Sequence, residues 1–108
     1  MDRIYISGKI GSKIINPSTR DKFKNAAQAL KESGFDVIDP TDQQTQSEIR
    51  EFAIKEDLPF YDAALLYDLR LIADCDAIYM LSDWYTSPGS YTEFYFAKAI
   101  GKQIYFQT

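Results

Sequence analysis

Short apolar runs alternate along the chain with longer segments in which apolar residues recur at helical spacing. The runs of strand length are Arg3–Ser7, Phe35–Ile38, Ala77–Leu81 and Gln103–Phe106. β-Branched and aromatic residues are common in them, and turn-forming residues bound them, which is typical of β-strands. The Ala77–Leu81 run is apolar throughout, so it predicts a strand that is buried on both faces.

Two helices are predicted before the third strand. The first has an apolar face of Phe23, Ala26, Ala27 and Leu30. Ser18 is its expected N-cap and Gly34 its end. Residues 40–47 are polar and are expected to form a loop. A short amphipathic helix follows from Ser47, and Pro59 limits its extent.

Two further helices flank the third strand. The Tyr61–Asp74 segment predicts a helix whose apolar stripe consists of Tyr61, Ala64, Leu65, Leu69 and Ile72. The last helix follows the loop TSPGS and ends at Gly101.

Strands that alternate with helices predict a parallel sheet with right-handed crossovers, covered on both faces. We expect an α/β, flavodoxin-like (Rossmann-like) three-layer sandwich with four strands in the order 2-1-3-4. The 108 residues fit one compact domain. Ligands of such sheets bind beyond the carboxyl ends of the strands, at the switch point between strands one and three. The loops Ser7–Asn16 and Ser82–Ser90 are expected to meet there.

Composition excludes several classes of function. A net charge of −4 disfavours binding to nucleic acid polymers, which needs clustered Lys and Arg. No apolar run approaches the roughly 20 residues of a membrane span. The N-terminus has no apolar signal region and Cys75, an expected core residue, is the lone cysteine, so we expect a cytoplasmic protein. Histidine is absent, which excludes Ser-His and Cys-His nucleophile pairs and disfavours zinc.

Two acidic residues lie on the apolar faces of predicted helices. At about 100° per residue, Glu93 shares a face with Ala97, and Asp68 lies between Ala64 and Ile72. A carboxylate belongs in water unless something pairs with it. Two inward acids beside the same strand suggest a shared site, where desolvation and repulsion raise at least one pKa.

Each acid also has a purely structural interpretation. Ser90-Tyr-Thr-Glu93 matches the S/T-x-x-E capping box, in which the Glu side chain bonds the amide of the cap. Asp68 is alternatively an acceptor for a backbone hydrogen bond, or a side chain that extends to the rim.

Glycoside chemistry needs little beyond two carboxylates, one to attack the anomeric carbon and one to handle the proton of the leaving group. It requires no metal and no cofactor, and we expect none. The start of the last helix provides backbone N–H groups for an anion. Its candidate binding residues are Ser87, Gly89 and Ser90, and those of the first loop are Ser7, Gly8, Lys9 and Ile10.

Two aromatic residues complete the candidates. Tyr5 lies near the carboxyl end of the first strand, where it is either a polar site residue or a core aromatic with its hydroxyl at the rim. Trp84 either lines the pocket and stacks on a base or belongs to an interface, together with Tyr85, Tyr91 and Tyr95.

In this combination of motifs, the chain resembles the nucleoside 2-deoxyribosyltransferases and the related deoxynucleoside 5′-monophosphate N-glycosidases. The matching motifs are Ile4-Tyr-Ile-Ser-Gly8, Tyr67-Asp-Leu69, Cys75-Asp-Ala-Ile78, and Ser87-x-Gly-x-x-x-Glu93 followed by Ala97 and Gly101-Lys102. The compact form is similar to small phage or prophage members.

The resemblance implies a role for each polar candidate. Glu93 is the implied nucleophile at C1′ of the deoxyribose, and Tyr5 orients its carboxylate. Asp68 contacts the sugar or protonates the departing base. Ser87 stands where transferases carry an Asp and is similar to the phosphate-contacting serine of the N-glycosidases.

The implied function is hydrolysis of the N-glycosidic bond of a (deoxy)nucleoside 5′-monophosphate. The alternatives are 2-deoxyribosyl transfer between bases and a nucleotide-binding or sensor module without turnover. The family also implies a homodimer.

Overall fold

The computed structural model describes residues 2–11 and 14–108. Four parallel strands form one sheet in the order β2-β1-β3-β4. The strands are β1 (Arg3–Ser7), β2 (Asp36–Ile38), β3 (Ala77–Met80) and β4 (Gln103–Phe106). The predicted flavodoxin-like, three-layer α/β fold and its strand order are confirmed.

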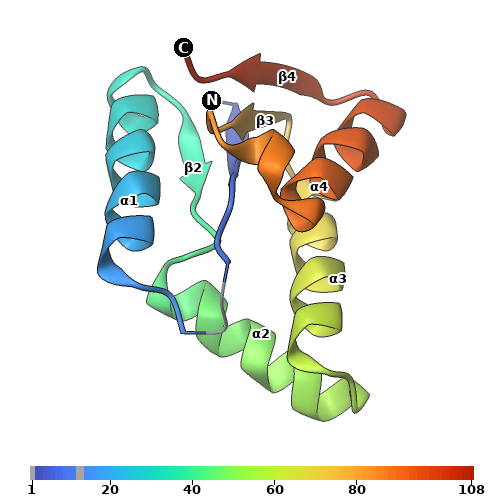
Figure 1. The fold of residues 1–108 in the computed structure, drawn as a ribbon. Coiled ribbons are helices and arrows are strands. Elements are labelled where there is room, and N and C mark those ends of the chain that lie inside the picture. Colours follow the sequence, from blue (N-terminus) through green and yellow to red (C-terminus); the bar gives the residue numbers. More distant parts are fainter. Residues whose placement is uncertain (1, 12–13) are drawn as a thin grey trace.

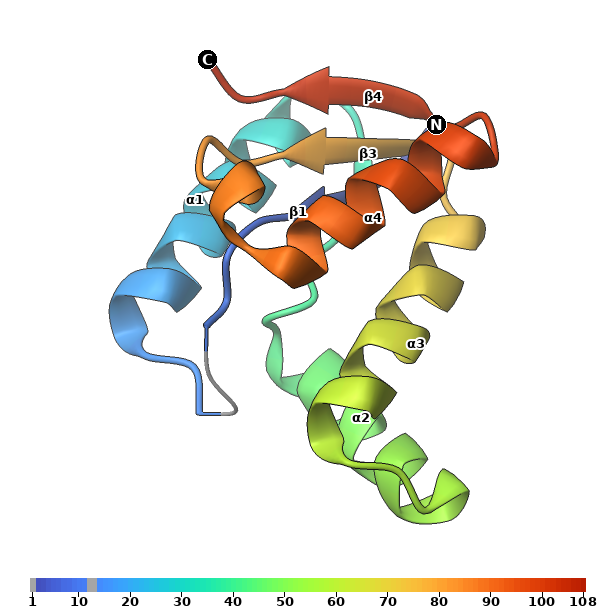
Figure 2. The same cartoon turned by 45° about the vertical axis from the view of Figure 1, so that its right-hand side comes forward.

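Helices cover both faces of this sheet (Figures 1 and 2). One face carries α1 (Pro17–Glu32), and the other carries α3 (Phe60–Ala73) and α4 (Pro88–Ala99). The remaining helix, α2 (Gln43–Glu56), packs mainly on α3 at the carboxyl end of the sheet, and the short 3₁₀ helix η1 (Trp84–Thr86) precedes α4. No helix in the described part of the chain is long and apolar enough to cross a membrane.

The alternation of side chains along β1 sends its residues to two different cores. Ile4 and Ile6 pack under α1, whereas Tyr5 packs with the core beneath α3 and α4. By the same period of two, Ser7 lies on the Tyr5 side of the sheet. Cys75 is buried in this second core, and burial raises the pKa of its thiol to about 11.

The start of α1 differs from the prediction. The N-cap is Asn16, not Ser18, and its Oδ1 accepts a hydrogen bond from the backbone N–H of Thr19 at 2.9 Å. Pro17 occupies the first helical position, where its fixed φ suits the helix and makes the preceding residue the cap.

The predicted loop over residues 40–47 was also wrong. α2 begins at Gln43, because Asp42 caps it by accepting a hydrogen bond from the Thr45 N–H at 2.7 Å. The helix therefore has 14 residues and ends before Asp57, which adopts a left-handed conformation with φ 53°. Pro59 is the N-cap of α3 instead of the residue that limits α2.

Burial on α3 also departs from the predicted stripe. Tyr61 is exposed, and the buried positions are Ala63, Asp68 and Ile72. The acid is thus part of the buried face of the helix.

Candidate functional site

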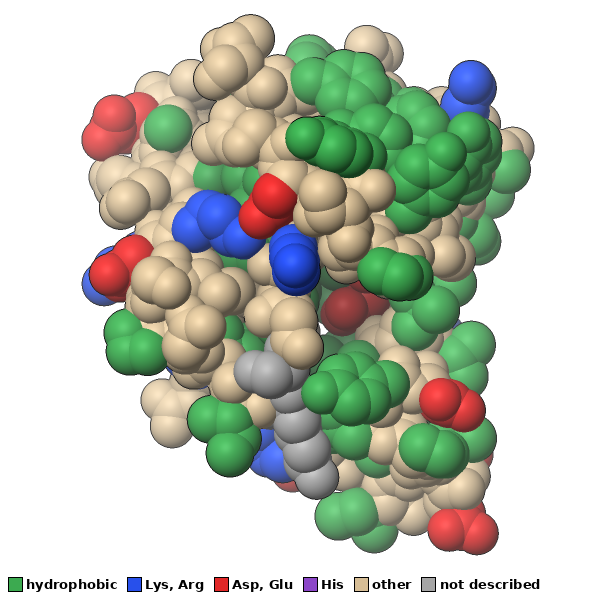
Figure 3. Space-filling view, in the orientation of Figure 1, with side chains coloured by type: hydrophobic (Ala, Val, Ile, Leu, Met, Phe, Trp, Pro, Cys, Tyr) green, Lys and Arg blue, Asp and Glu red, His purple; other side chains and the backbone are tan. Residues whose placement is uncertain are grey.

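A cavity of about 660 Å³ opens at the carboxyl end of β1, between α3 and the start of α4. Its size is ordinary for a small-molecule site. Figure 3 shows it as a hollow with carboxylate atoms at its base and basic side chains near its rim. Its lining includes Gly8, Ile10 and Gly11 after β1, Gln46 and Ile49 from α2, Phe60, Tyr61, Asp62, Leu65 and Asp68 from α3, and Ser87, Pro88, Gly89, Ser90 and Glu93 from α4.

Glu93 lies at the base of the cavity with 6% of its surface exposed. Its Oε2 accepts a hydrogen bond from the Tyr5 hydroxyl at 3.1 Å, and its Oε1 accepts one from Ser7 Oγ at 2.7 Å. Both donors come from β1, two residues apart, because alternate side chains of a strand point to the same face. The carboxylate is therefore held at both oxygens by one strand.

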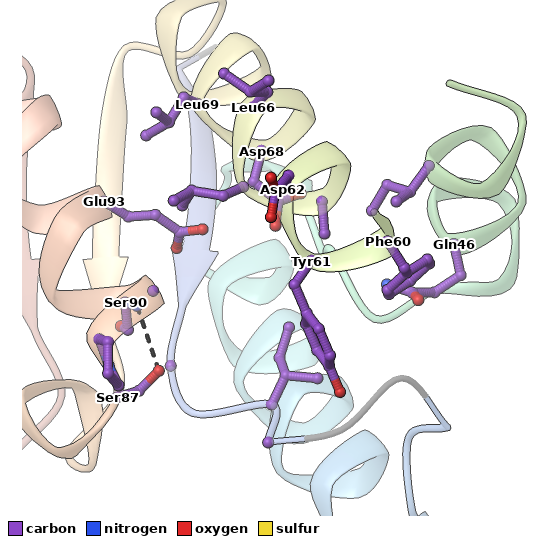
Figure 4. Close-up of a pocket in the computed structure, with 18 residues that line it drawn as sticks. Gln46, Phe60, Tyr61, Asp62, Leu66, Asp68, Leu69, Ser87, Ser90 and Glu93 are labelled. Carbon is purple, nitrogen blue, oxygen red and sulfur yellow. Dashed lines mark hydrogen bonds between the residues drawn. The ribbon is translucent and has the colours of Figure 1, made fainter. Parts of the chain in front are cut away.

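The capping-box interpretation of Glu93 is wrong. α4 begins at Pro88, and its N-cap is Ser87, whose Oγ accepts a hydrogen bond from the Ser90 N–H at 3.3 Å. As in α1, a proline follows the cap and sets the start of the helix. Glu93 is the sixth residue of α4 and its side chain points into the cavity (Figure 4).

Asp68 reaches the same cavity from α3 with 5% of its surface exposed. Figure 4 shows it facing Glu93 across the cavity. Its Oδ1 is buried and has no hydrogen-bond partner among the described residues. A buried unpaired polar atom costs about 1–3 kcal/mol in free energy of folding, and in a cavity it suggests a ligand or water as its partner.

Burial changes the protonation of all three polar groups. It raises the pKa of Glu93 to about 7, although the hydrogen bonds from Ser7 and Tyr5 lower it in part. Burial, followed by repulsion from Glu93, raises the pKa of Asp68 well above its usual range. Burial and the neighbouring carboxyls also raise the pKa of Tyr5, so its hydroxyl stays protonated and remains a donor. Each of the two carboxyls therefore keeps its proton to a higher pH than it would in water.

The N-terminus of α4 forms the second polar wall of the cavity. Ser87 Oγ accepts the cap hydrogen bond, so its own proton remains for a ligand. Pro88 has no backbone N–H. The N–H of Gly89 lies in the first turn of α4, where the helix provides no backbone carbonyl to accept its hydrogen bond. Both Ser87 and Gly89 line the cavity. This wall can therefore donate hydrogen bonds to an anion.

The loop after β1 contributes backbone to the cavity. A Cβ at Gly8 would lie 2.6 Å from Leu81 Cδ1, so the close approach of this loop to the end of β3 requires glycine. Lys9, a predicted binding residue of this loop, is exposed and does not line the cavity. Its backbone binds two other segments: the N–H donates to Asp83 Oδ1 after β3 at 3.1 Å, and the carbonyl accepts from Lys22 Nζ of α1 at 2.9 Å.

Trp84 lies outside the cavity lining. Its ring stacks on Tyr91 with 5.5 Å between centroids and contacts Phe94 at 4.6 Å. It is thus part of an aromatic cluster on the far side of α4 and not a platform for a base in this pocket.

The apolar wall of the cavity comes from residues that sequence analysis did not assign to a site. Ile49 of α2 and Leu65 of α3 form part of it, and Gln46 of α2 adds a polar group. Gln46 Nε2 donates to the Pro40 carbonyl at 2.7 Å, which fixes the orientation of its amide. The spacing of Gln46 and Ile49 places them on one helical face, but Gln46 fell in the segment predicted as loop, so the pair was not recognised.

No group of three His, Cys, Asp or Glu side chains within residues 2–11 and 14–108 is arranged to hold a metal ion.

The sequence model of a family described as "Domain of unknown function (DUF4406)" matches residues 2–106. No curated protein matches the chain.

Proposed function

We propose that this chain, which belongs to the DUF4406 family, hydrolyses the N-glycosidic bond of a deoxynucleoside 5′-monophosphate through a covalent glycosyl-Glu93 intermediate. The observation that carries the proposal is the pair of buried acids, Glu93 and Asp68, facing one cavity from different helices. One is held as an acceptor by two hydroxyl donors, and the other has an unpaired oxygen.

The first step uses the different protonation of the two acids. An oxygen of the Glu93 carboxylate attacks C1′ of the sugar, and the bond between C1′ and the base nitrogen breaks. The protonated Asp68 gives its proton to the departing base. The raised pKa of Asp68 suits the role of the acid, whereas the hydrogen bonds from Tyr5 and Ser7 favour the ionised form of Glu93 that attacks.

The second step returns the site to its starting state. Water attacks C1′, the ester bond to Glu93 breaks, and Asp68, now ionised, takes a proton from the water. The products are the free base and 2-deoxyribose 5-phosphate. Ser87 and the Gly89 N–H at the start of α4 suit the phosphate.

Incubation of the purified chain with each deoxynucleoside 5′-monophosphate, followed by chromatography for free base, tests the proposal. We expect native protein to release base from at least one nucleotide, and Glu93→Gln to be slower by at least about 10³-fold. Glu51→Gln, at an exposed position on α2, is the matched control and should retain the native rate. Failure of the native chain to cleave any nucleotide, or unchanged cleavage by Glu93→Gln, would contradict it.

The same assay separates the alternatives. Addition of a second free base reveals transfer if a new nucleotide forms in place of the sugar phosphate. A binding module would instead show a rise in Tm with nucleotide and no base released during long incubation.

The role of Asp68 has a test of its own. Asp68→Asn should slow release of a natural base by about 10²–10⁴-fold, because the general acid is lost. With a substrate whose leaving group needs no proton, such as a nitrophenyl deoxyriboside phosphate, Asp68→Asn should release nitrophenol in the first turnover at close to the native rate, because the water step that also uses Asp68 comes later. Equal losses of first-turnover release on both substrates would argue against proton donation by Asp68.

A further inference from the structure

We propose that Ser7 and Ser90 are positioning residues whose hydroxyls form a directed relay, Ser90 to Ser7 to Glu93, that holds Glu93 as a carboxylate. This assignment rests on the proposed function, in which Glu93 is the nucleophile. In this assignment both serines stabilise Glu93 of the protein itself, and neither binds the substrate.

The relay joins two elements in the most buried part of the site. Ser7 is 1% exposed and Ser90 is 2% exposed. Their Oγ atoms lie 2.7 Å apart, and Ser7 Oγ lies 2.7 Å from Glu93 Oε1. Ser90 and Glu93 are three residues apart on α4 and so share the helix face that meets β1.

Counting protons sets the direction of the relay. A serine hydroxyl has one proton, and an ionised carboxylate can only accept. Since Ser7 gives its proton to Glu93, the proton between the two serines must come from Ser90. While Glu93 is ionised, Ser90 has no hydroxyl proton left for a ligand. Ser87 is the serine at this wall whose proton stays available.

The relay acts against the cost of burying a charge. The titratable groups that face Glu93 are Tyr5 from β1 and Asp68 from α3. Tyr5 donates to Oε2 at 3.1 Å, whereas Ser7 donates to Oε1 at the shorter distance of 2.7 Å. Asp68 adds no positive charge, and among the described residues no Lys or Arg lines the cavity. Hydroxyl donors therefore take the place that a cation would otherwise have in stabilising the carboxylate.

Titration of the Glu93 carboxyl by ¹³C NMR tests the relay without any substrate. The chain is labelled at glutamate side-chain carboxyls, and the Glu93 signal is identified by its absence in Glu93→Gln. We expect Ser7→Ala to raise the pKa of Glu93 by about one to two pH units, since a hydrogen bond to a charged group is lost. Ser90→Ala should raise it by less, because Ser7 can still donate to Glu93 but no longer receives a proton itself.

Two variants control for indirect effects. Thr92→Ala removes an exposed hydroxyl from the same helix and should leave the titration of Glu93 unchanged. Ser90→Thr keeps the donor and should restore the native titration. If Ser7→Ala does not fold, Ser7→Cys, which is slightly larger than serine but donates only weakly, takes its place. In the base-release assay, the acidic limb of the plot of kcat/KM against pH should shift in each variant together with the pKa of Glu93.

An unchanged Glu93 titration in a folded Ser7 variant overturns the relay, as does an equal change in Thr92→Ala. These results are independent of cleavage. Absence of base release together with the expected titration would reject the proposed hydrolysis while leaving the relay in place.

Discussion

At the scale of single residues, the site places an acid where an apolar residue would stabilise the fold. Burial raises the pKa of Glu93 from 4.5 to about 7, so the native state binds its proton more tightly than the unfolded chain does. The ionised form is the form that attacks carbon, and it is also the form that burial penalises. Activity and stability therefore make opposite demands on this position.

This conflict predicts how stability varies with pH. Because the folded pKa of Glu93 lies above the unfolded value, its protonation stabilises the native state below about pH 4.5, and that contribution is lost as pH rises to about 7. The loss amounts to at most about 3 kcal/mol. Denaturant unfolding at pH 5 and pH 8 should show native protein losing stability across this interval.

Glu93→Gln is the matched variant for that measurement. It cannot ionise, so its loss of free energy of unfolding between pH 5 and pH 8 should be smaller than the native loss. The same slope in native and variant protein would mean that Glu93 titrates alike in both states. Asp68 contributes to the slope in the same direction, since burial raises its pKa as well.

At the scale of secondary-structure elements, helix caps decide where the polar groups of the site lie. α1 and α4 both begin with a polar cap followed by proline, at Asn16-Pro17 and Ser87-Pro88. The cap of α1 is not among the residues that line the cavity, whereas the cap of α4 forms part of its wall. The two helices offer a matched pair for separating capping from ligand binding.

We predict that Ser87→Ala and Asn16→Ala each lower the free energy of unfolding by about 1 kcal/mol, because each removes the acceptor for one N–H at a helix start. Only Ser87→Ala should also weaken nucleotide binding, by about tenfold for a lost hydrogen bond to phosphate. Thermal unfolding with and without a deoxynucleotide measures both effects. Equal loss of ligand stabilisation in the two variants would show that the cap has no direct role in binding.

At the scale of the whole molecule, one face is unusually aromatic. Figure 3 shows hydrophobic side chains gathered over α4 and the end of β4. Around Trp84 lie the exposed rings of Tyr85, Tyr91, Tyr95 and Phe106, of which Tyr95 and Phe106 are both 51% exposed. Contiguous exposed aromatic surface is typical of an interaction site.

We expect this face to join two copies of the chain. Sedimentation equilibrium should show a dimer for native protein, and Tyr95→Glu should shift it to monomer, because two carboxylates would be buried at the interface. Lys55→Glu, an exposed change on α2, should leave the dimer intact. A native protein that stays monomeric over the whole concentration range would rule out self-association.

The sequence by itself was sufficient for the architecture. Apolar runs and helical periodicity predicted strands that alternate with helices, because those patterns indicate which faces are buried. The flavodoxin-like winding of such parallel sheets then gave the order 2-1-3-4. The same patterns also pointed to Glu93 and Asp68, since an acid on an apolar face is visible without coordinates. The predicted starts of the helices were less accurate. Asn16 and Asp42 cap their helices through side-chain hydrogen bonds, and nearby polar residues such as Ser18 are also candidates for the cap.

Only the tertiary structure decided what surrounds those acids. Ser7 and Glu93 are 86 residues apart, and their 2.7 Å contact depends on how β1 and α4 pack. The packing of the helices also left Trp84 outside the cavity lining and brought Gln46 of α2 to its wall. Local sequence patterns indicate which side of a helix or strand is buried, but they do not indicate which residues of other elements that side contacts.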